Sequence, residues 1–273
     1  MGASDRLVLE TDVMTFSFGN LLLVGGISVL AVALLMTVTG FIGARAGKVS
    51  VVDTTWGLGF IAVALVAALV GHGSGSRRLL LLALVAIWGG RLAWHIGRKN
   101  AGKPEDPRYT KMKEGKSTVA VILKVYGLQG VLIWFISLPL QVSAAAGGGV
   151  VWVVVLGALL WLLGVVFEAT GDAQLSAFKA DSSNKGKVMD KGLWSLTRHP
   201  NYFGDSCVWW GLFVIAASAS PGVLTVLSPI VMTYFLVFGS GGKFLEREMS
   251  KRPGYQDYMA RTSFFLPRPP KKA

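Results

Sequence analysis

The sequence has few of the residues from which disulfides and metal sites are built. It contains one cysteine, Cys207, and three histidines, His72, His95 and His199, among 273 residues. A single cysteine excludes an internal disulfide and any metal site made of several cysteines. The histidines show no metal-binding spacing such as HExxH. We therefore expect no metal ion.

Charged residues are scarce as well, and long apolar runs take their place. Charged residues make up 15% of the chain and hydrophobic residues 52%, with a mean hydropathy of +0.54. A helix needs roughly 17–25 apolar residues to cross a bilayer. Seven stretches of about that length can be marked, near residues 18–41, 51–71, 79–97, 118–141, 149–168, 201–220 and 222–239. The sequence predicts an all-α integral membrane protein with seven transmembrane helices.

Lysine and arginine are unevenly shared between the connections of these stretches. Alternate connections, starting after the first stretch, hold 22 basic residues, whereas the other ends hold three. Because cytoplasmic loops are enriched in Lys and Arg, this bias places the N-terminus outside and the C-terminus in the cytoplasm. The net charge of +12 then reflects topology and attraction to anionic membrane lipids, and we expect no nucleic-acid partner.

Two glycine-rich motifs resemble nucleotide-binding loops but lie in the wrong context. Gly57–Ala62 matches a loose dinucleotide fingerprint, yet it lies inside an apolar stretch and not after a strand. Close helix packing through small residues explains it better. Gly239–Lys243 resembles a phosphate loop but lacks its spacing and its following Ser or Thr. This pattern favours a break at the end of the last helix.

The most polar short segment lies at the start of the sixth stretch. Residues 192–210 read GLWSLTRHPNYFGDSCVWW. Eight positions of this segment hold Arg198, His199, Asn201, Tyr202 and Asp205. Such groups are costly to bury in a membrane without partners, so the cluster is a candidate site. Asn201 and Asp205 are one helical turn apart, and a helix cap needs only one of them, which favours function over capping.

Further polar residues recur on the same, cytoplasmic side. Trp88, Arg91 and His95 are spaced three and four apart, which places them on one face of a helix. Asp53 lies near the start of the second stretch, where capping a helix is an equal alternative. Lone basic residues near helix ends commonly carry only surface charge, which is the alternative for Lys179, Lys243 and Arg247. The remaining members of the set are Trp56, Glu168, Asp172, Gln174, Glu246, Tyr255 and Tyr258.

The chemistry of this set suits a ligand with an anionic head that lies beside a lipid. Cationic and amide donors stand at the cytosolic mouth, and apolar walls lie deeper. Two cytosolic cofactors fit, NADPH and S-adenosylmethionine. The number of basic side chains near the mouth favours NADPH, which is the more anionic of the two.

A longer motif carries a resemblance to a known family. The segment GLWSLTRHPNYFGDSCVWWG is followed by Glu246, Pro253-Gly254-Tyr255, Tyr258, Thr262 and Phe265-Leu266-Pro267. This pattern resembles the bacterial DUF1295 family, among membrane reductases with a steroid 5-alpha-reductase-like C-terminal domain. The resemblance covers roughly 165–267 and extends more loosely back to Asp53. It implies a seven-helix membrane fold, in a bacterial plasma membrane, that takes NADPH from the cytoplasm and a lipid-like substrate from the bilayer.

The resemblance also implies an organisation and a set of cofactor contacts. We expect a single membrane domain over 1–273, with the substrate side in 18–164 and the cofactor-binding half in 165–267. Asp172 and Asn201 match cofactor ligands of the family, and Asp205 replaces a Glu. The expected cofactor-binding set is Arg91, Asp172, Lys179, Arg198, His199, Asn201, Tyr202, Asp205, Lys243, Arg247, Tyr255 and Tyr258.

Three residues form the expected catalytic end. Steroid 5-alpha-reductases polarise a carbonyl with a Glu and a Tyr, and the corresponding positions here resemble Asp53 and Trp88. A tryptophan donates one hydrogen bond but cannot deliver a proton as a phenol can, so this chain departs from the family pattern. We expect Asp53, with Trp88 or His95 nearby, to polarise the substrate or donate the proton.

The expected function is therefore an NADPH-dependent reductase of a carbon–carbon double bond in a sterol-like or fatty lipid. One alternative is an S-adenosylmethionine-dependent methyltransferase acting on a lipid or isoprenylcysteine-type group, because the C-terminal half is similar to that family too. A second alternative is a non-catalytic lipid-binding membrane protein. The polar residues before 165 favour the reductase, because the shorter methyltransferase core has no use for them.

Overall fold

The prediction of an all-α protein is confirmed. The computed structural model describes residues 15–239 and 241–271, and within these residues there is no strand, only two isolated β-bridges. The helices are α1 (Phe18–Ala46), α2 (Val51–Val70), α3 (Gly75–Asn100), α4 (Pro107–Lys113), α5 (Thr118–Ile136), α6 (Leu138–Ala145), α7 (Val151–Ala180), η1 (Ser182–Asn184), α8 (Leu193–Leu196), α9 (Pro200–Ala217), η2 (Gly222–Val226), α10 (Leu227–Val237), α11 (Gly242–Met249) and α12 (Tyr255–Arg261).

Six helical segments among the described residues are long and apolar enough to cross a membrane. These are α1, α2, α3, α5, α7 and the run Gly222–Met249, which takes in η2, α10 and α11. The chain therefore has the helices of an integral membrane protein. The sixth predicted stretch, 201–220, corresponds to the 18-residue α9, which is not among the six. The count of seven spans and the orientation of the termini stay predictions.

Two helix boundaries differ from the sequence-based ones for local reasons. The predicted stretch 118–141 is split, because α5 ends at Ile136 and α6 begins at Leu138. Pro139 has no N–H to bond to the preceding turn, and its ring clashes with the carbonyl four residues back. The predicted stretch 149–168 is too short, because α7 continues to Ala180. Its polar last turns hold no proline that would end the helix.

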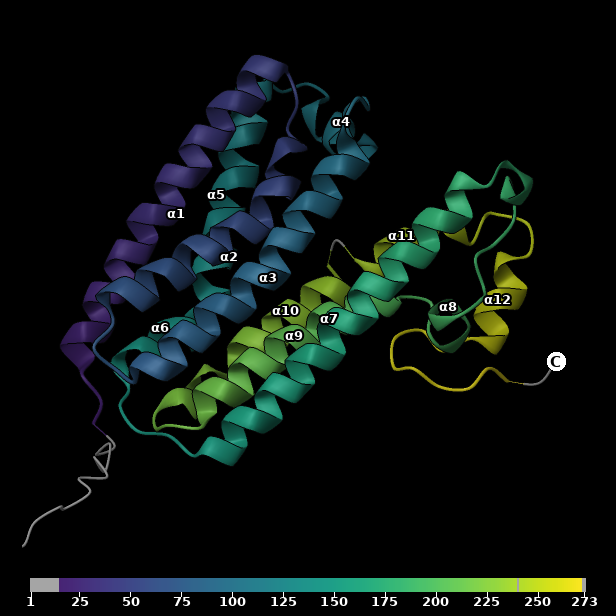
Figure 1. Ribbon diagram of the computed structural model, residues 1–273. Coiled ribbons are helices and arrows are strands. Elements are labelled where there is room, and N and C mark those ends of the chain that lie inside the picture. The colour runs from purple at the N-terminus through teal and green to yellow at the C-terminus, as the bar shows by residue number, and fades with distance from the viewer. Residues whose placement is uncertain (1–14, 240, 272–273) are drawn as a thin grey trace, which may run out of the picture. The chain divides into compact units, whose positions relative to one another are not determined.

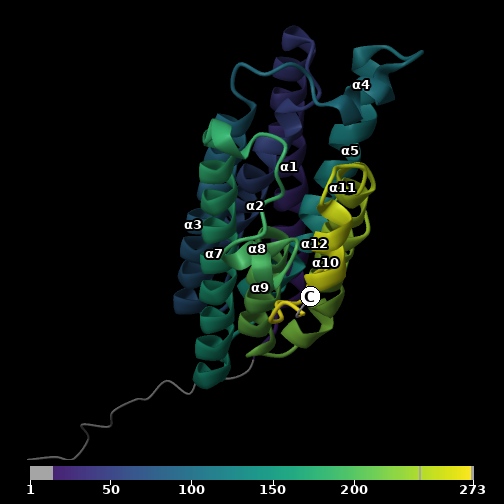
Figure 2. The same ribbon diagram turned by 90° about the vertical axis from the view of Figure 1, so that its right-hand side faces the viewer.

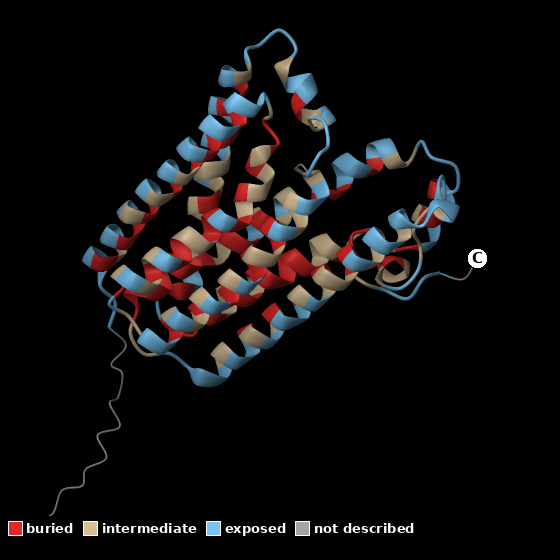
Figure 3. Ribbon diagram, turned by 45° about the horizontal axis from the view of Figure 1, so that its top comes forward, coloured by how far each residue is buried: buried red, intermediate tan, exposed pale blue. Residues whose placement is uncertain are grey.

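The chain divides into two compact units. Unit 1 takes in Met1–Val151 and Ala216–Thr225, and unit 2 takes in Trp152–Ile215 and Val226–Ala273. In unit 1, α2 packs against α1 and α3, and α5 and α6 pack against both α1 and α2 (Figure 1). Buried residues recur every three or four positions along α1 (Figure 3), which is the spacing of one helical face.

Glycines bring α2 and α3 into backbone contact in unit 1. A side-chain carbon added at Gly57 of α2 would lie 2.3 Å from the Gly89 carbonyl oxygen of α3, and one added at Gly89 would lie 2.7 Å from that of Gly57. The two backbones therefore touch. This confirms that the glycines at Gly57–Ala62 serve helix packing.

Glycines also join two helices of unit 2. Gly157, Gly164 and Gly171 are seven residues apart on α7, and Gly204 and Gly211 are seven apart on α9. A side-chain carbon added at Gly157 would lie 2.7 Å from the Gly211 carbonyl oxygen, and one added at Gly164 would lie 2.5 Å from the Gly204 carbonyl oxygen. The numbering rises along one helix as it falls along the other, so α7 and α9 run antiparallel, side by side (Figure 2).

Candidate functional site

Asp53 lies in the first turn of α2, with its carboxylate bound by two side chains of α4. The Tyr109 hydroxyl donates to Asp53 Oδ1 at 2.6 Å, and Arg108 Nη2 donates to Asp53 Oδ2 at 3.2 Å. The side chain of Asp53 keeps 20% of its surface exposed, and that of Arg108 keeps 34%. A carboxylate, a phenol and a guanidinium therefore meet at the end of a candidate membrane span.

The capping alternative for Asp53 is not what the structure shows. The N-cap of α2 is Ser50, whose side chain makes no capping bond. Glu105 takes this role from a distant loop, because its carboxylate accepts bonds from the Val49 amide at 2.6 Å and the Ser50 amide at 3.0 Å. Burial would raise the pKa of Glu105, but these amides and Lys113 outweigh that effect and lower the pKa to about 2. Asp53 is left for its partners on α4.

A strong start signal positions α4. Asp106 is the N-cap and accepts a bond from the Arg108 amide at 2.8 Å, and Pro107 occupies the first turn. Asp106 also pairs with the Arg108 side chain at 3.0 Å. Burial, together with the charge of Asp53 and the hydrogen bond to it, raises the pKa of Tyr109, so the phenol keeps its proton at neutral pH.

Sequence reasoning missed Arg108 and Tyr109. They belong to a seven-residue helix in a polar connection, far too short to span a membrane. The pair Asp106-Pro107 is the one local signal that predicts a helix there. No local signal predicts that this helix contacts Asp53, because Asp53 precedes Arg108 by 55 positions and Tyr109 by 56.

The expected catalytic partners of Asp53 on α3 lie in the packed core or are half-buried along the helix. Trp88 is fully buried and its ring lies 5.6 Å from that of Phe60, which in turn contacts Trp56 edge-on at 5.3 Å. This aromatic row makes Trp88 part of the packed core of unit 1. Arg91 and His95 follow on the same helix and are half-buried.

In unit 2, the α7–α9 contact gathers the acidic and amide residues. Asn201 Nδ2 donates to Asp172 Oδ1 at 3.3 Å, beside the contact between Gly171 and Pro200. Glu168 and Asp205 are 3% and 7% exposed. The structure thus brings two residues of the predicted set, Asp172 and Asn201, into contact, although Asp172 lies within α7 and not at its end.

Arg198 and His199 are bound mainly to the C-terminal part of unit 2. The Arg198 guanidinium pairs with Glu246, with Nη2 donating to Oε2 at 3.1 Å, and Nη1 donates to the carbonyls of Met259 at 3.0 Å and Thr262 at 2.6 Å. His199 Nε2 lies 3.3 Å from Glu246 Oε1. Four of the five N–H groups of Arg198 are accounted for by this chain.

The other expected cofactor residues of unit 2 differ in how far they are buried. Tyr255 and Tyr258 are buried with their rings 5.6 Å apart, and the Tyr258 hydroxyl donates to the Trp194 carbonyl at 2.6 Å. Burial raises the pKa of Tyr255 to about 12. Tyr202 is half-buried and stacks on His199 at 5.5 Å. The exposed residues of the set are Lys179, Lys243 and Arg247.

No metal centre is found in the part of the chain that the structure describes. Residues 15–239 and 241–271 hold no group of three or more His, Cys, Asp or Glu side chains that could bind a metal ion.

Comparisons with known proteins give a family but no activity. The family model described as "Protein of unknown function (DUF1295)" matches residues 40–262. The chain is 25% identical over 237 residues to "Uncharacterized protein C594.04c" of Schizosaccharomyces pombe, in an alignment that covers 73% of this chain. The chain spans 66% of the length of that relative. No solved structure matches.

Proposed function

We propose that this chain, which belongs to the DUF1295 family, is an NADPH-dependent membrane reductase that saturates a carbon–carbon double bond in a sterol-like or fatty lipid. The observation that carries the proposal is the bond between Tyr109 and Asp53 at 2.6 Å. Trp88 cannot replace the phenol of the reductases that the sequence resembles. Tyr109 supplies a phenol from another part of the chain.

The proposed proton path uses three residues of unit 1. Tyr109 turns its O–H from Asp53 to the substrate and gives its proton to one end of the reducing double bond or to a conjugated oxygen. Arg108, which is paired with the same carboxylate at 3.2 Å, offsets the negative charge left on the phenol. Asp53 then returns a proton from solvent to the phenolate, which restores the starting state.

The residues of unit 2 fit a phosphorylated dinucleotide in type. NADPH supplies a hydride when it is bound. Exposed Lys243 and Arg247 offer cationic donors of the kind that bind phosphates, and the Asp172–Asn201 pair offers an acid and an amide for hydroxyl or amide groups. Arg198 and His199 act by holding the segment that carries these donors, because Glu246 of α11 is their shared partner.

Nucleotide binding by the purified full chain tests the cofactor. We expect NADPH to bind more tightly than NADH or S-adenosylmethionine, and Asn201→Ala to weaken NADPH binding by roughly 5–150-fold, the loss of one amide contact of about 1–3 kcal/mol. The matched control is Asn184→Ala, because Asn184 bonds only locally, to Phe178 and Asp181. Binding of S-adenosylmethionine without any nicotinamide nucleotide would favour a methyltransferase instead.

The proposal includes the orientation of the chain in the membrane, because NADPH must reach its site from the cytoplasm. Seven spans place residues 98–117, 172–198 and 240–273 in the cytoplasm, where NADPH is found, and the N-terminus outside. In a Cys207→Ser background, cysteines at the exposed positions Thr110 and Val150 should react with a membrane-impermeant maleimide from opposite sides. Labelling of both from one side would contradict the seven-span topology.

A further inference from the structure

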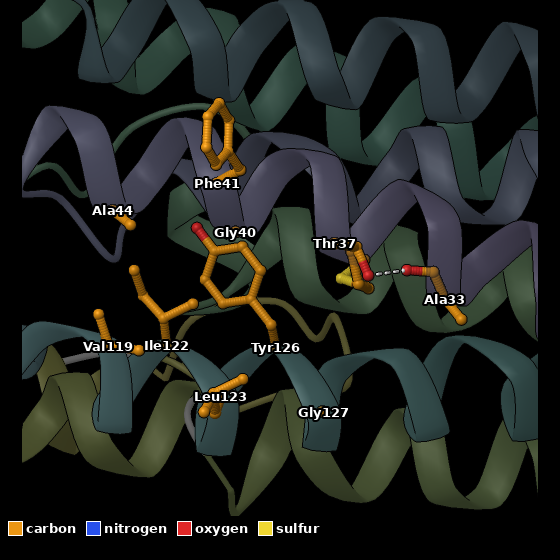
Figure 4. Close-up of a pocket in the computed structure, with 11 residues that line it drawn as sticks. Ala33, Thr37, Gly40, Phe41, Ala44, Val119, Ile122, Leu123, Tyr126 and Gly127 are labelled. Atoms are coloured by element: carbon orange, nitrogen blue, oxygen red, sulfur yellow. Dashed lines mark hydrogen bonds between the residues drawn. The ribbon is translucent and has the colours of Figure 1, made fainter.

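A groove runs between α1 and α5 within unit 1. Figure 4 shows Phe41 and Tyr126 on its walls. It has a volume of about 430 Å³. Its lining residues are Ala33, Met36, Thr37, Gly40, Phe41, Ala44, Val119, Ile122, Leu123, Tyr126 and Gly127.

The wall of this groove offers apolar contacts only. It contains no charged side chain, and its two hydroxyl groups are already used. Thr37 donates to the Ala33 carbonyl at 2.8 Å, and Tyr126 donates to the Val49 carbonyl at 3.1 Å. A polar ligand would find no free partner there, whereas a hydrocarbon chain would need none.

Glycines contribute to the hollow. A side-chain carbon added at Gly127 of α5 would meet nothing within 4 Å, while one added at Gly40 of α1 would lie 3.3 Å from Ile122. Glycine inside a helix costs about 1 kcal/mol relative to alanine, so neither residue favours the helix that carries it. At Gly127 the missing side chain leaves open space along the wall.

The length of the groove matches one leaflet of a bilayer. From Ala33 to Ala44 the α1 wall advances about 17 Å at 1.5 Å per residue. The hydrocarbon core of a bilayer is about 30 Å thick, so the groove covers roughly half of it. Both α1 and α5 are candidate membrane spans. A single acyl chain of one leaflet fits these dimensions.

One end of the groove is strongly basic. Arg45 directly follows the lining residue Ala44, is exposed, and lies with its guanidinium carbon 4.4 Å from the ring of Phe41. Among the described residues it makes no hydrogen bond or ion pair. At this end Lys48 reaches the carbonyl of Lys103 at 2.6 Å. Segments 45–48 and 98–117 together hold nine Lys or Arg and three Asp or Glu.

We propose that the groove between α1 and α5 binds one anionic glycerophospholipid as a resident ligand. Its acyl chain lies along the apolar wall, and its phosphate lies beside Arg45. A guanidinium binds phosphate oxygens in a bidentate manner, which suits this position. The basic end adds a general attraction for an anionic headgroup over a neutral one. The site does not depend on the proposed reductase activity, because the lipid is bound and not converted.

Lipid retention by the full chain tests this site. Native mass spectrometry in detergent, with phosphatidylglycerol or phosphatidylcholine of identical acyl chains added, should show one phosphatidylglycerol bound about fivefold more tightly than phosphatidylcholine. Gly127→Leu should lower retention of both lipids by at least about tenfold, because it fills the groove. The matched control Gly26→Leu, also with open space around the added carbon but outside the groove, should bind as wild type does.

Two further variants make the result decisive. Arg45→Gln should bind phosphatidylcholine as wild type does and should lose most of the preference for phosphatidylglycerol, because it removes the direct phosphate contact and leaves only the general attraction of the other basic side chains. Should Gly127→Leu fail to fold, Ala33→Phe fills the same groove from an exposed position of α1. Wild-type retention in a folded groove-filling variant would overturn the proposal. Equal binding of the two lipids by the wild-type chain would overturn it as well.

Discussion

The two units each contain a cluster of charged side chains, and the two clusters differ in depth. In unit 2, the side chains of Arg198 and Glu246 are 9% and 10% exposed. In unit 1, those of Arg108 and Asp53 are 34% and 20% exposed. The first cluster is closed around partners from its own chain, whereas the second remains within reach of solvent and other molecules.

This difference separates two uses of an ion pair. A buried pair that is bonded on every side holds backbone segments together, and its removal leaves an uncompensated charge. A group that exchanges protons with a substrate must stay accessible. The most conspicuous motif of the sequence, around Arg198 and His199, therefore mainly stabilises the folded structure of unit 2. The less conspicuous Asp53, Arg108 and Tyr109 are the better candidates for chemistry.

The largest effect is expected at Asp53, in the more exposed cluster. Asp53→Asn removes the carboxyl group that returns a proton to Tyr109 but keeps a side chain of the same shape that can still accept a bond from Tyr109. We expect lipid reduction to fall by about 10²–10⁴-fold, the usual share of a general acid, with thermal stability and NADPH binding near wild type. Tyr109→Phe should show the same pattern. Steady-state assays and nucleotide titrations on both variants measure it.

A matched tyrosine serves as the control. Tyr126→Phe removes a hydroxyl that donates to the Val49 carbonyl at 3.1 Å and should leave turnover largely intact. Normal turnover in Asp53→Asn would make Asp53 a structural residue. Normal turnover in Tyr109→Phe as well would leave His95 and Tyr126 as the candidate acids.

The next largest effect should appear in the closed cluster, and in stability. Arg198→Met leaves Glu246 buried without its main partner, which typically costs about 3–5 kcal/mol. We expect a lower unfolding temperature in detergent and faster tryptic cleavage between α11 and the C-terminus. The control is Arg247→Met, because Arg247 is an exposed arginine on α11, the helix that carries Glu246. Its free energy of unfolding should stay within about 0.5 kcal/mol of wild type. An Arg198→Met variant as stable as wild type would contradict the structural role of the buried Arg198–Glu246 pair.

The smallest effect concerns pH and Glu105, which binds the backbone at the start of α2 in unit 1. Because the pKa of Glu105 in the folded chain is about 2, below its usual 4.5, its contribution to stability is present above pH 4.5 and is lost as the pH falls toward 2. At pH 7, Glu105→Gln should cost about 1 kcal/mol at this half-buried site. Unfolding temperatures of the two proteins should converge as the pH is lowered. A gap that widens in acid would contradict the assigned pairing.

How far the sequence predicted this molecule depends on the range of each interaction. The start of α2 at Val51 coincides with the predicted stretch 51–71, because a membrane helix is encoded by its own apolar residues. The split before Pro139 was missed because hydropathy alone does not register a proline.

The candidate site was predicted only where its members are neighbours in sequence. The spacing of Asn201 and Asp205 placed both on one turn of α9, and the structure shows that turn. The partners of Arg198 on Met259 and Thr262, more than 60 positions later, carry no local signal. Tyr109 was missed for the same reason.

The glycine contact between α7 and α9 has a thermodynamic consequence. A helix interface made of leucines must freeze the rotamers of every side chain that it buries, at about 0.5–1 kcal/mol each. Gly157, Gly164, Gly204 and Gly211 have no rotamers to freeze, so the folded pair forgoes that entropy loss. At each of the four glycines an added methyl group would lie 2.5–2.7 Å from a backbone atom of the other helix, and a backbone atom cannot rotate aside. The interface therefore combines a low entropic cost of assembly with almost no tolerance of substitution.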